Sequence, residues 1–306
     1  MNDTNKLAGW PPALPQTRQR PGFLLVGGPG LFWIVLFLLV PLGAILFTSF
    51  LSRGDYGQIQ SPLTLANYKR LLGFGELGFD WLYPQIIFRS LALAAATVLL
   101  CLAAGLPLAF FIARLSRRWK NVGLTLVVIP FWTNLLIRTY AWQILFAPES
   151  VLSNFAAACG FIPREAGLYP GLFAVLVGLV CDYLPFLVLP LYASVEKIDW
   201  TLAEAAADLG ANSFNVFRHA LLPQIRPGLT AGAILVFLPA TGQFVIPDLL
   251  GGAKTALLGN AIQQQFSQSR DWPFGSAIAC VAIVWLVLGL WLYQRTANKS
   301  GEEVVL

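Results

Sequence analysis

The sequence predicts an all-α membrane protein with six transmembrane helices. Of its 306 residues, 57% are hydrophobic and only 11% are charged. Soluble domains contain about a quarter charged residues, so this composition indicates a chain that is surrounded by lipid. The 10 Trp and 22 Phe agree with this, because aromatic side chains suit both the hydrocarbon and the headgroup zone.

The lengths of the apolar runs give the number of crossings. A helix needs about 20 apolar residues to cross a hydrocarbon layer ~30 Å thick. Six runs qualify: 31–50, 90–113, 122–145, 171–191, 229–250 and 274–293. The first is too long for a signal-peptide core and lacks a small-residue cleavage site, so we expect it to remain as an anchor. Residues 27–30, Gly-Gly-Pro-Gly, are expected to break the helix just before it. The third run is the least regular, because Arg138 interrupts it.

These runs divide the chain into a polar N-terminal tail, a six-helix domain and a C-terminal tail. The corresponding residues are 1–22, 23–295 and 296–306. Gly228 and Gly232 have the spacing that permits close packing of a membrane helix against a neighbour.

Basic residues indicate the orientation. The tails and the loops after the second and fourth runs carry more Lys and Arg than the other loops. The segment 114–120 holds four basic residues and no acidic one, and it is very short. By the positive-inside rule, this side and both termini are expected to be cytoplasmic.

Several other functions are disfavoured. No CxxC or Cys/His spacing exists, so we expect neither a metal site nor a disulfide framework. The clustering of basic residues in short loops indicates membrane topology and not nucleic-acid binding. No Ser/His/Asp arrangement is visible, and His219, the one histidine, is expected at the surface. We therefore expect a transport role, with no catalytic residue and no cofactor.

The loop at about 196–227 is the most informative segment. Thr201 and Glu204 have capping-box spacing, which predicts a helix starting near Leu202. Gly210 suits the left-handed position that ends such a helix.

A second short helix is expected to follow. Ser213 can cap it, and Pro223 and Pro227 are expected to close it. Several alanines give the first helix a low-relief surface against which another protein can pack: Ala203, Ala205, Ala206 and Ala207.

Here the chain resembles the permease subunits of ATP-binding-cassette importers. Their cytoplasmic signature reads Glu-Ala-Ala, three residues, Gly, nine residues, Ile, one residue, Leu-Pro. The matching residues are Glu204, Ala205, Ala206, Gly210, Leu222 and Pro223. The Ile position is occupied by Ala220 instead. The resemblance implies the type I importer permease fold, in which this loop is the coupling helix that docks on an ATPase subunit. An ordinary capped pair of helices would also explain Glu204.

The chain has no GxxxxGK[ST] phosphate loop, since residues 251–255 lack the spacing. Energy is therefore expected from a partner ATPase.

Further segments are similar to one branch of that family, the polyamine (spermidine/putrescine) permeases of the PotB/PotH type. They are residues 130–142, 189–199, 244–252, 259–260 and 270–275. The resemblance covers about residues 30–295. It implies a multi-pass protein of the plasma (inner) membrane that assembles with a second permease, two ATPase subunits and an external polyamine-binding protein.

A polyamine pathway needs carboxylates for the ammonium groups and aromatic faces for cation–π contact. Asp182 falls near the middle of the fourth run, where a carboxylate costs about 2.5–3.5 kcal/mol and should face the bundle interior. Candidate pathway residues are Asp182, Trp132, Asn134, Tyr140 and Tyr183. Two interpretations of Asp182 stay open, namely a ligand for the substrate and a partner for Arg138. Trp132 and Tyr140 are interpreted first as packing or interface aromatics and second as ligands.

Two other transport functions would need different residues. An importer subunit for a ferric or oxyanion ligand would need Lys and Arg in its pathway, and only Arg138 lies deep in a run. A stand-alone secondary transporter would be indicated by an inverted repeat and paired intramembrane acids, and neither is visible in the sequence.

Overall fold

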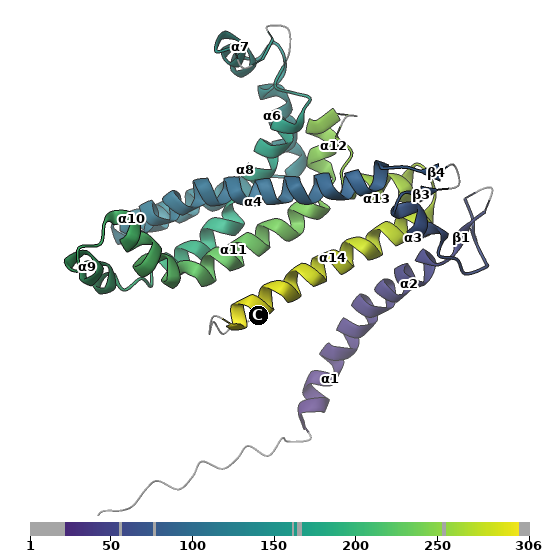
Figure 1. Ribbon diagram of the computed structural model, residues 1–306, viewed down its shortest axis with the longest axis horizontal. Helices are drawn as coiled ribbons and strands as arrows, with labels where there is room; N and C mark the ends of the chain where they lie inside the picture. The colour runs from purple at the N-terminus through teal and green to yellow at the C-terminus, as the bar shows by residue number, and fades with distance from the viewer. Residues whose placement is uncertain are drawn as a thin grey trace, which may run out of the picture. The chain divides into compact units, whose positions relative to one another are not determined.

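The computed structural model describes residues 22–54, 57–75, 78–160, 162–163, 167–252 and 255–299. The chain divides into two compact units, residues 1–47 and 48–306. Residues 1–21 and 300–306, which make up most of the two predicted tails, lie outside the described residues. The described part is mainly α-helical, which confirms the predicted fold class (Figure 1).

The described helices account for the predicted crossings. Five are long and apolar enough to cross a membrane: Gly27–Ser49, Leu82–Arg114, Leu172–Val195, Ser213–Gly242 and Trp272–Trp291. A bent pair, Arg117–Trp132 with Leu135–Leu145, makes a sixth crossing if it is counted as one. All six predicted runs are therefore found, although their ends and their continuity differ from the prediction.

The first unit contains a continuous apolar helix. It consists of α1 (Gly22–Ile34), a π turn (Val35–Leu39) and α2 (Val40–Ser49), whose last residues enter the second unit. The predicted break at 27–30 is wrong, because Pro29 lies inside α1. Membrane helices tolerate such a residue where the surrounding structure compensates for the missing N–H.

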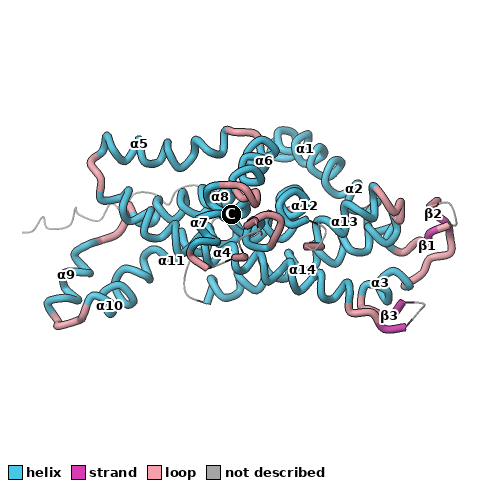
Figure 2. The backbone as a smooth tube through the Cα atoms, turned by 90° about the horizontal axis from the view of Figure 1, so that it is seen from above, coloured by secondary structure: helices cyan, strands magenta, loops and turns pink. Residues whose placement is uncertain are grey.

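The core of the second unit lies among three long helices. They are α4 (Leu82–Arg114), α8 (Leu172–Val195) and α11 (Leu222–Gly242), which pack against one another (Figures 1 and 2). Each carries apolar residues around most of its circumference, as expected for helices that face lipid on one side and protein on the other.

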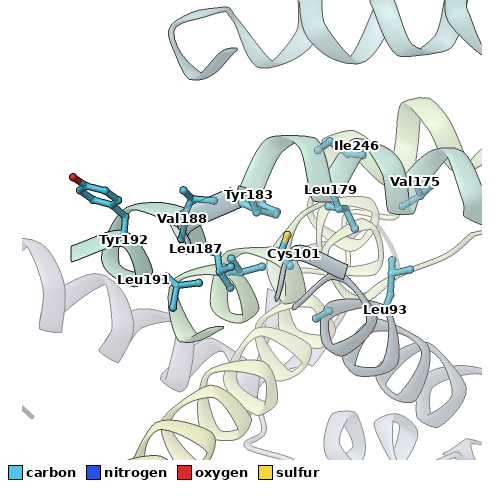
Figure 3. Close-up of a cluster of buried hydrophobic side chains, with 14 of the residues drawn as sticks. Leu93, Cys101, Val175, Leu179, Tyr183, Leu187, Val188, Leu191, Tyr192 and Ile246 are labelled. Carbon is cyan, nitrogen blue, oxygen red and sulfur yellow. The ribbon is translucent and has the colours of Figure 1, made fainter. Parts of the chain in front are cut away.

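Buried side chains from these helices form one cluster. Leu93 and Cys101 of α4 lie in it with Leu179 and Leu187 of α8, and all four are almost inaccessible to solvent (Figure 3). Among the described residues, this cluster contains most of the buried apolar side chains. Because it holds the three helices together, it also fixes where the loops at their ends lie.

Two glycines bring α11 against α8. A Cβ on Gly228 would clash with the carbonyl oxygen of Pro190, and one on Gly232 would lie 3.0 Å from the carbonyl oxygen of Leu187. The close packing predicted from their spacing is therefore confirmed.

The third run is not one helix. α5 (Arg117–Val128) passes through a 3-10 turn (Ile129–Trp132) into α6 (Leu135–Leu145), with a bend of 92°. Pro130 in the turn cannot donate a backbone hydrogen bond, and the Asn134 side chain accepts from the Leu136 N–H at 2.8 Å to begin a new helix. The predicted continuous span 122–145 is wrong for this reason.

The fifth run is also interrupted. α11 ends at Gly242, and a separate helix, α12 (Val245–Gly251), follows. The Gln243 side chain accepts from the N–H groups of Phe244 and Val245, which replaces the helical hydrogen bonds at the break. The predicted extent 229–250 therefore covers two helices.

The two ends of the second unit are different. One end holds small elements: β1 (Ser52–Arg53) paired antiparallel with β2 (Ile59–Gln60), α3 (Ala66–Leu71), β3 (Phe74–Gly75) paired antiparallel with β4 (Gly78–Phe79), and α13 (Leu258–Ser267). Asp271, just before α14 (Trp272–Lys299), is buried there and accepts from Arg70 at 3.0 Å.

The opposite end holds α9 (Trp200–Asp208) and α10 (Ser213–Val216) (Figure 1). A further short helix, α7 (Val151–Ala158), follows α6.

Candidate functional site

The loop between α8 and α11 begins with a capped helix. The Asp199 carboxylate accepts from the Thr201 N–H at 3.0 Å and from the Thr201 hydroxyl at 2.7 Å. Both bonds stabilise the ionised form, so the Thr201 side chain and backbone lower the pKa of Asp199. α9 therefore starts at Trp200, two residues before the predicted start near Leu202. The cap is Asp199 and not Thr201, which is its hydrogen-bond donor.

Gly210 ends α9 in the left-handed conformation, with φ of 83°, which confirms the prediction for this residue. Its N–H donates to the Ala207 carbonyl, and the Ala211 N–H donates to the Ala206 carbonyl at 3.1 Å. No atom lies within 4 Å of the position that a Cβ would take. Backbone conformation, and not space, is therefore what favours glycine here.

The second short helix differs from the prediction. Asn212, and not Ser213, caps α10, because its side chain accepts from the Asn215 N–H at 2.8 Å. α10 then continues through a π turn, Phe217–Leu221, into α11. Pro223 stands in the first turn of α11 and Pro227 lies inside it, so these prolines do not close a helix. A π turn directly before Pro223 accommodates the missing N–H and the bulk of the ring.

Hydrogen bonds from the Gln224 side chain connect α11 to the start of α9. Its Oε1 accepts from the Asp199 N–H at 2.8 Å, and its Nε2 donates to the carbonyls of Ala220 at 2.8 Å and Asp199 at 3.4 Å. The sequence prediction missed this residue. The only signal for it was a polar side chain immediately after Leu222-Pro223.

α5 and α4 also hold this end of the bundle. Lys120 forms an ion pair with Glu196 at 3.2 Å, and the Tyr192 hydroxyl donates to the same carboxylate at 2.8 Å. The Tyr192 and Lys120 bonds lower the pKa of Glu196. The Arg114 guanidinium lies 5.8 Å from the centre of the Trp200 ring.

Four of the predicted coupling residues lie on α9 or in the turn after it, and Leu222 and Pro223 begin α11. Glu204 and Ala205 on α9 are exposed, Ala206 and Leu222 are partly buried, and Pro223 is exposed. Large apolar side chains surround them, since Leu202, Leu209 and Phe214 are 52%, 90% and 66% exposed. An exposed apolar surface on a polar loop is typical of a protein-docking site.

The predicted pathway residues differ in burial and in their bonding partners. Asp182 and Tyr183 are buried in α8, and the Tyr183 hydroxyl accepts from Gln243 at 3.1 Å. Asn134 is the cap of α6. Trp132 and Tyr140 are 79% and 50% exposed. The last two residues are thus available to lipid or to a partner, whereas the first three already have structural roles.

Asp182 has an intrachain partner. Its carboxylate forms an ion pair with Arg138 of α6, and both side chains are largely buried. A second N–H of Arg138 donates to the Pro130 carbonyl at the bend. Of the two interpretations that the sequence left open, the structure thus contains the pair with Arg138.

A family model described as "Binding-protein-dependent transport system inner membrane component" matches residues 105–299. This range includes the bent span, the α9–α10 loop and α14. The chain belongs to this family. The family prediction made from the Glu204–Pro223 motif is confirmed, and with its apolar helices the chain is a multi-pass inner-membrane protein.

Several curated relatives match nearly the whole chain. The spermidine/putrescine transport system permease protein PotB of Haemophilus influenzae is 40% identical over 90% of this chain and 93% of its own. PotB of Escherichia coli is 41% identical over 90% of this chain and 97% of its own. The sulfate transport system permease protein CysT of Salmonella typhimurium is 26% identical over 96% of this chain and 99% of its own.

Solved structures share the fold. A chain of a bacterial alginate ABC transporter, in complex with a pentasaccharide-bound periplasmic protein, has a TM-score of 0.70 and 16% identity, covering 91% of this chain and 95% of that one. A second structure of an alginate importer has a TM-score of 0.66 and 18% identity. These likenesses confirm the type I importer permease architecture.

Proposed function

We propose that this protein is a permease subunit of an ATP-driven importer of polyamines such as spermidine and putrescine, and that it forms half of the translocation pathway. The observation that carries the proposal is the 40–41% identity to PotB proteins along 90% of the chain. The sulfate permease relative covers as much of the chain at only 26%. The protein itself carries out no covalent chemistry, and a separate ATPase supplies the energy.

The tip of the α9–α10 loop is the proposed docking site for that ATPase. Three features support it: the left-handed turn at Gly210, the exposed Leu209, and the bonds from Gln224 that fasten α9 to α11. Other partners are a second permease, an external substrate-binding protein and the lipid bilayer. Trp132 and Tyr140 are exposed on the surface that is left for the second permease or for lipid.

The basic residues support an orientation with the α9 end in the cytoplasm. Arg114 and Lys120 lie beside α9, and Lys197 follows α8 at the same end. The positive-inside rule assigns such an end to the cytoplasm, and with it both termini. The opposite end, with Asp271 and the small strands, then faces the binding protein.

The ion pair of Asp182 favours a neutralising role over a ligand role. Arg138 neutralises the buried Asp182 carboxylate, so the ion pair has little net negative charge with which to bind a substrate ammonium group. Carboxylates for the polycation would then be supplied largely by the second permease. The same pair argues against an oxyanion substrate, because the Arg138 guanidinium is occupied.

Uptake by the reconstituted complex tests the proposal. The chain is co-expressed with its partner subunits, placed in liposomes with the binding protein, and given radiolabelled spermidine, putrescine or sulfate. ATP-dependent uptake of a polyamine, saturable and blocked by the unlabelled compound, is the expected result. ATP-dependent sulfate uptake without polyamine uptake would overturn it in favour of the oxyanion function.

A further inference from the structure

We propose that the basic cavity beside α9 binds the headgroup of an anionic phospholipid. The cavity has a volume of about 390 Å³ and lies between the ends of α4 and α8 and the starts of α5 and α9. Its lining consists of Ala113, Arg114, Lys120, Val195, Glu196 and Trp200. The inference goes beyond the transport function and does not depend on which solute is carried.

The charges around the cavity are unbalanced. Its one lining carboxylate, Glu196, already accepts from Lys120 and from the Tyr192 hydroxyl. Arg114 is exposed, and its guanidinium contacts the Trp200 ring. Among the described residues, no ion pair involves Arg114. A planar guanidinium at the wall of an open cavity is a site for two parallel hydrogen bonds to a phosphate.

The start of α5 adds to this imbalance. The first turn of this 12-residue helix contains Arg117, Arg118 and Lys120 and no acidic residue. Ser116 precedes it without a capping side-chain hydrogen bond. A helix N-terminus carries partial positive charge, so basic residues there raise the electrostatic energy and a bound anion lowers it. The N-terminus of α5 and the basic side chains of its first turn therefore both favour an anionic ligand.

A second cavity indicates that the anion carries acyl chains. It has a volume of about 340 Å³, lies between α4, α5 and α8, and is lined mainly by apolar side chains such as Phe111, Leu126 and Leu184. Two of its lining residues are close in the chain to residues of the basic cavity, since Leu115 follows Arg114 and Gly123 is one turn beyond Lys120. A phosphate site next to an apolar groove matches a phospholipid and not a free phosphate ion.

Trp119 supports the same location. It is 62% exposed and stands between Arg118 and Lys120. An exposed tryptophan among basic residues is typical of the interface between the hydrocarbon and the headgroups, where anionic lipids attract Lys and Arg. Since Trp200 is the first residue of α9, a headgroup in this cavity would contact the proposed coupling helix directly.

Lipid binding to the intact purified complex tests the inference. Detergent-washed complex is titrated with phosphatidylglycerol or phosphatidylethanolamine, and bound lipid is counted by native mass spectrometry. The wild type is expected to retain phosphatidylglycerol preferentially. Arg114→Gln is expected to weaken phosphatidylglycerol binding about tenfold or more, because one charge-assisted contact is lost. Arg114→Lys keeps the positive charge but loses the two parallel N–H donors of the guanidinium. Its affinity for phosphatidylglycerol should therefore lie between those of the wild type and Arg114→Gln.

Arg226→Gln is the matched control, since it removes one exposed positive charge from the first turns of α11. It should leave binding near the wild-type level. Equal losses in Arg114→Gln and Arg226→Gln, or equal retention of the two lipids by the wild type, would overturn the proposal. Inorganic phosphate added in excess should not displace the lipid, and displacement would rule out the acyl-chain groove. None of these results depends on polyamine uptake, so they are separate from the test of the transport function.

Discussion

The Arg138 guanidinium joins the middle of α8 to a bend in the chain: it pairs with the Asp182 carboxylate in α8, and it donates to the Pro130 carbonyl at the bend between α5 and α6. One side chain thus neutralises a buried charge and adds a bond to a carbonyl that also accepts from the Thr133 N–H and hydroxyl. Removing either member of such a pair leaves an uncompensated charge in a medium of low dielectric constant.

We expect Asp182→Asn to destabilise the complex by about 3 kcal/mol or more, because Arg138 keeps its charge without a partner. The yield of detergent-extracted complex should fall together with uptake. The double variant Arg138→Gln with Asp182→Asn should recover both, since it replaces the ion pair by two neutral amides. Normal assembly of Asp182→Asn with loss of uptake alone would instead make Asp182 a substrate ligand.

Gly210→Val should uncouple ATP hydrolysis from transport. The left-handed conformation costs an ordinary L-residue about 1–2 kcal/mol, and a β-branched side chain more. The turn would relax and shift α9 at the docking site. Gly210→Asn is the matched control, because asparagine adopts this conformation readily and nothing lies within 4 Å of the added Cβ. The measurement is the number of ATP molecules hydrolysed per polyamine imported. An unchanged ratio in the valine variant would contradict the role given to this turn.

Gln224→Leu should release the start of α9 while leaving α11 intact. It removes two bonds to the Asp199 backbone, each worth about 1 kcal/mol net, and leaves a backbone N–H unpaired. Hydrogen exchange at residues 199–202 should become faster, and coupling should weaken. Thr230→Val is the control, since the Thr230 hydroxyl bonds only within its own helix. Equal exchange rates in the two variants would mean that Gln224 does not position α9.

Cysteine labelling tests the orientation. Arg117→Cys should react with an impermeant reagent only after the membrane is opened, and Arg270→Cys should react from outside. Arg270 is chosen because it is exposed, whereas the neighbouring Asp271 is buried against Arg70. The exposed Cys159 is first replaced by serine. Labelling of Arg117→Cys in intact cells would reverse the orientation.

Features that depend on local composition could be predicted from the sequence. The six apolar runs and the left-handed Gly210 follow from hydropathy and from the absence of a Cβ, and both are confirmed. The 92° bend at Pro130 was missed because hydropathy records only that both halves are apolar. A proline inside a membrane helix is also compatible with a straight span.

Interactions between distant residues could not be predicted. Gln224 and Asp199 are 25 positions apart, and their contact depends on how the π turn after α10 directs the start of α11. The pairing of Arg138 with Asp182 was one of two open possibilities, because the sequence does not say which faces of α6 and α8 meet. The exposure of Trp132 and Tyr140 could not be predicted for the same reason, because the sequence does not say which helix faces are covered.

The contact of Gly228 and Gly232 with the carbonyls of α8 has a mechanical consequence. At these two positions the α11 backbone lies directly against the Pro190 and Leu187 carbonyls, so we expect α8 and α11 to tilt together and not to slide past each other. α8 has 24 residues and is therefore roughly 36 Å long. If the ATPase docks at α9 as proposed, we expect a small rotation there to become a larger displacement at the opposite end of α8.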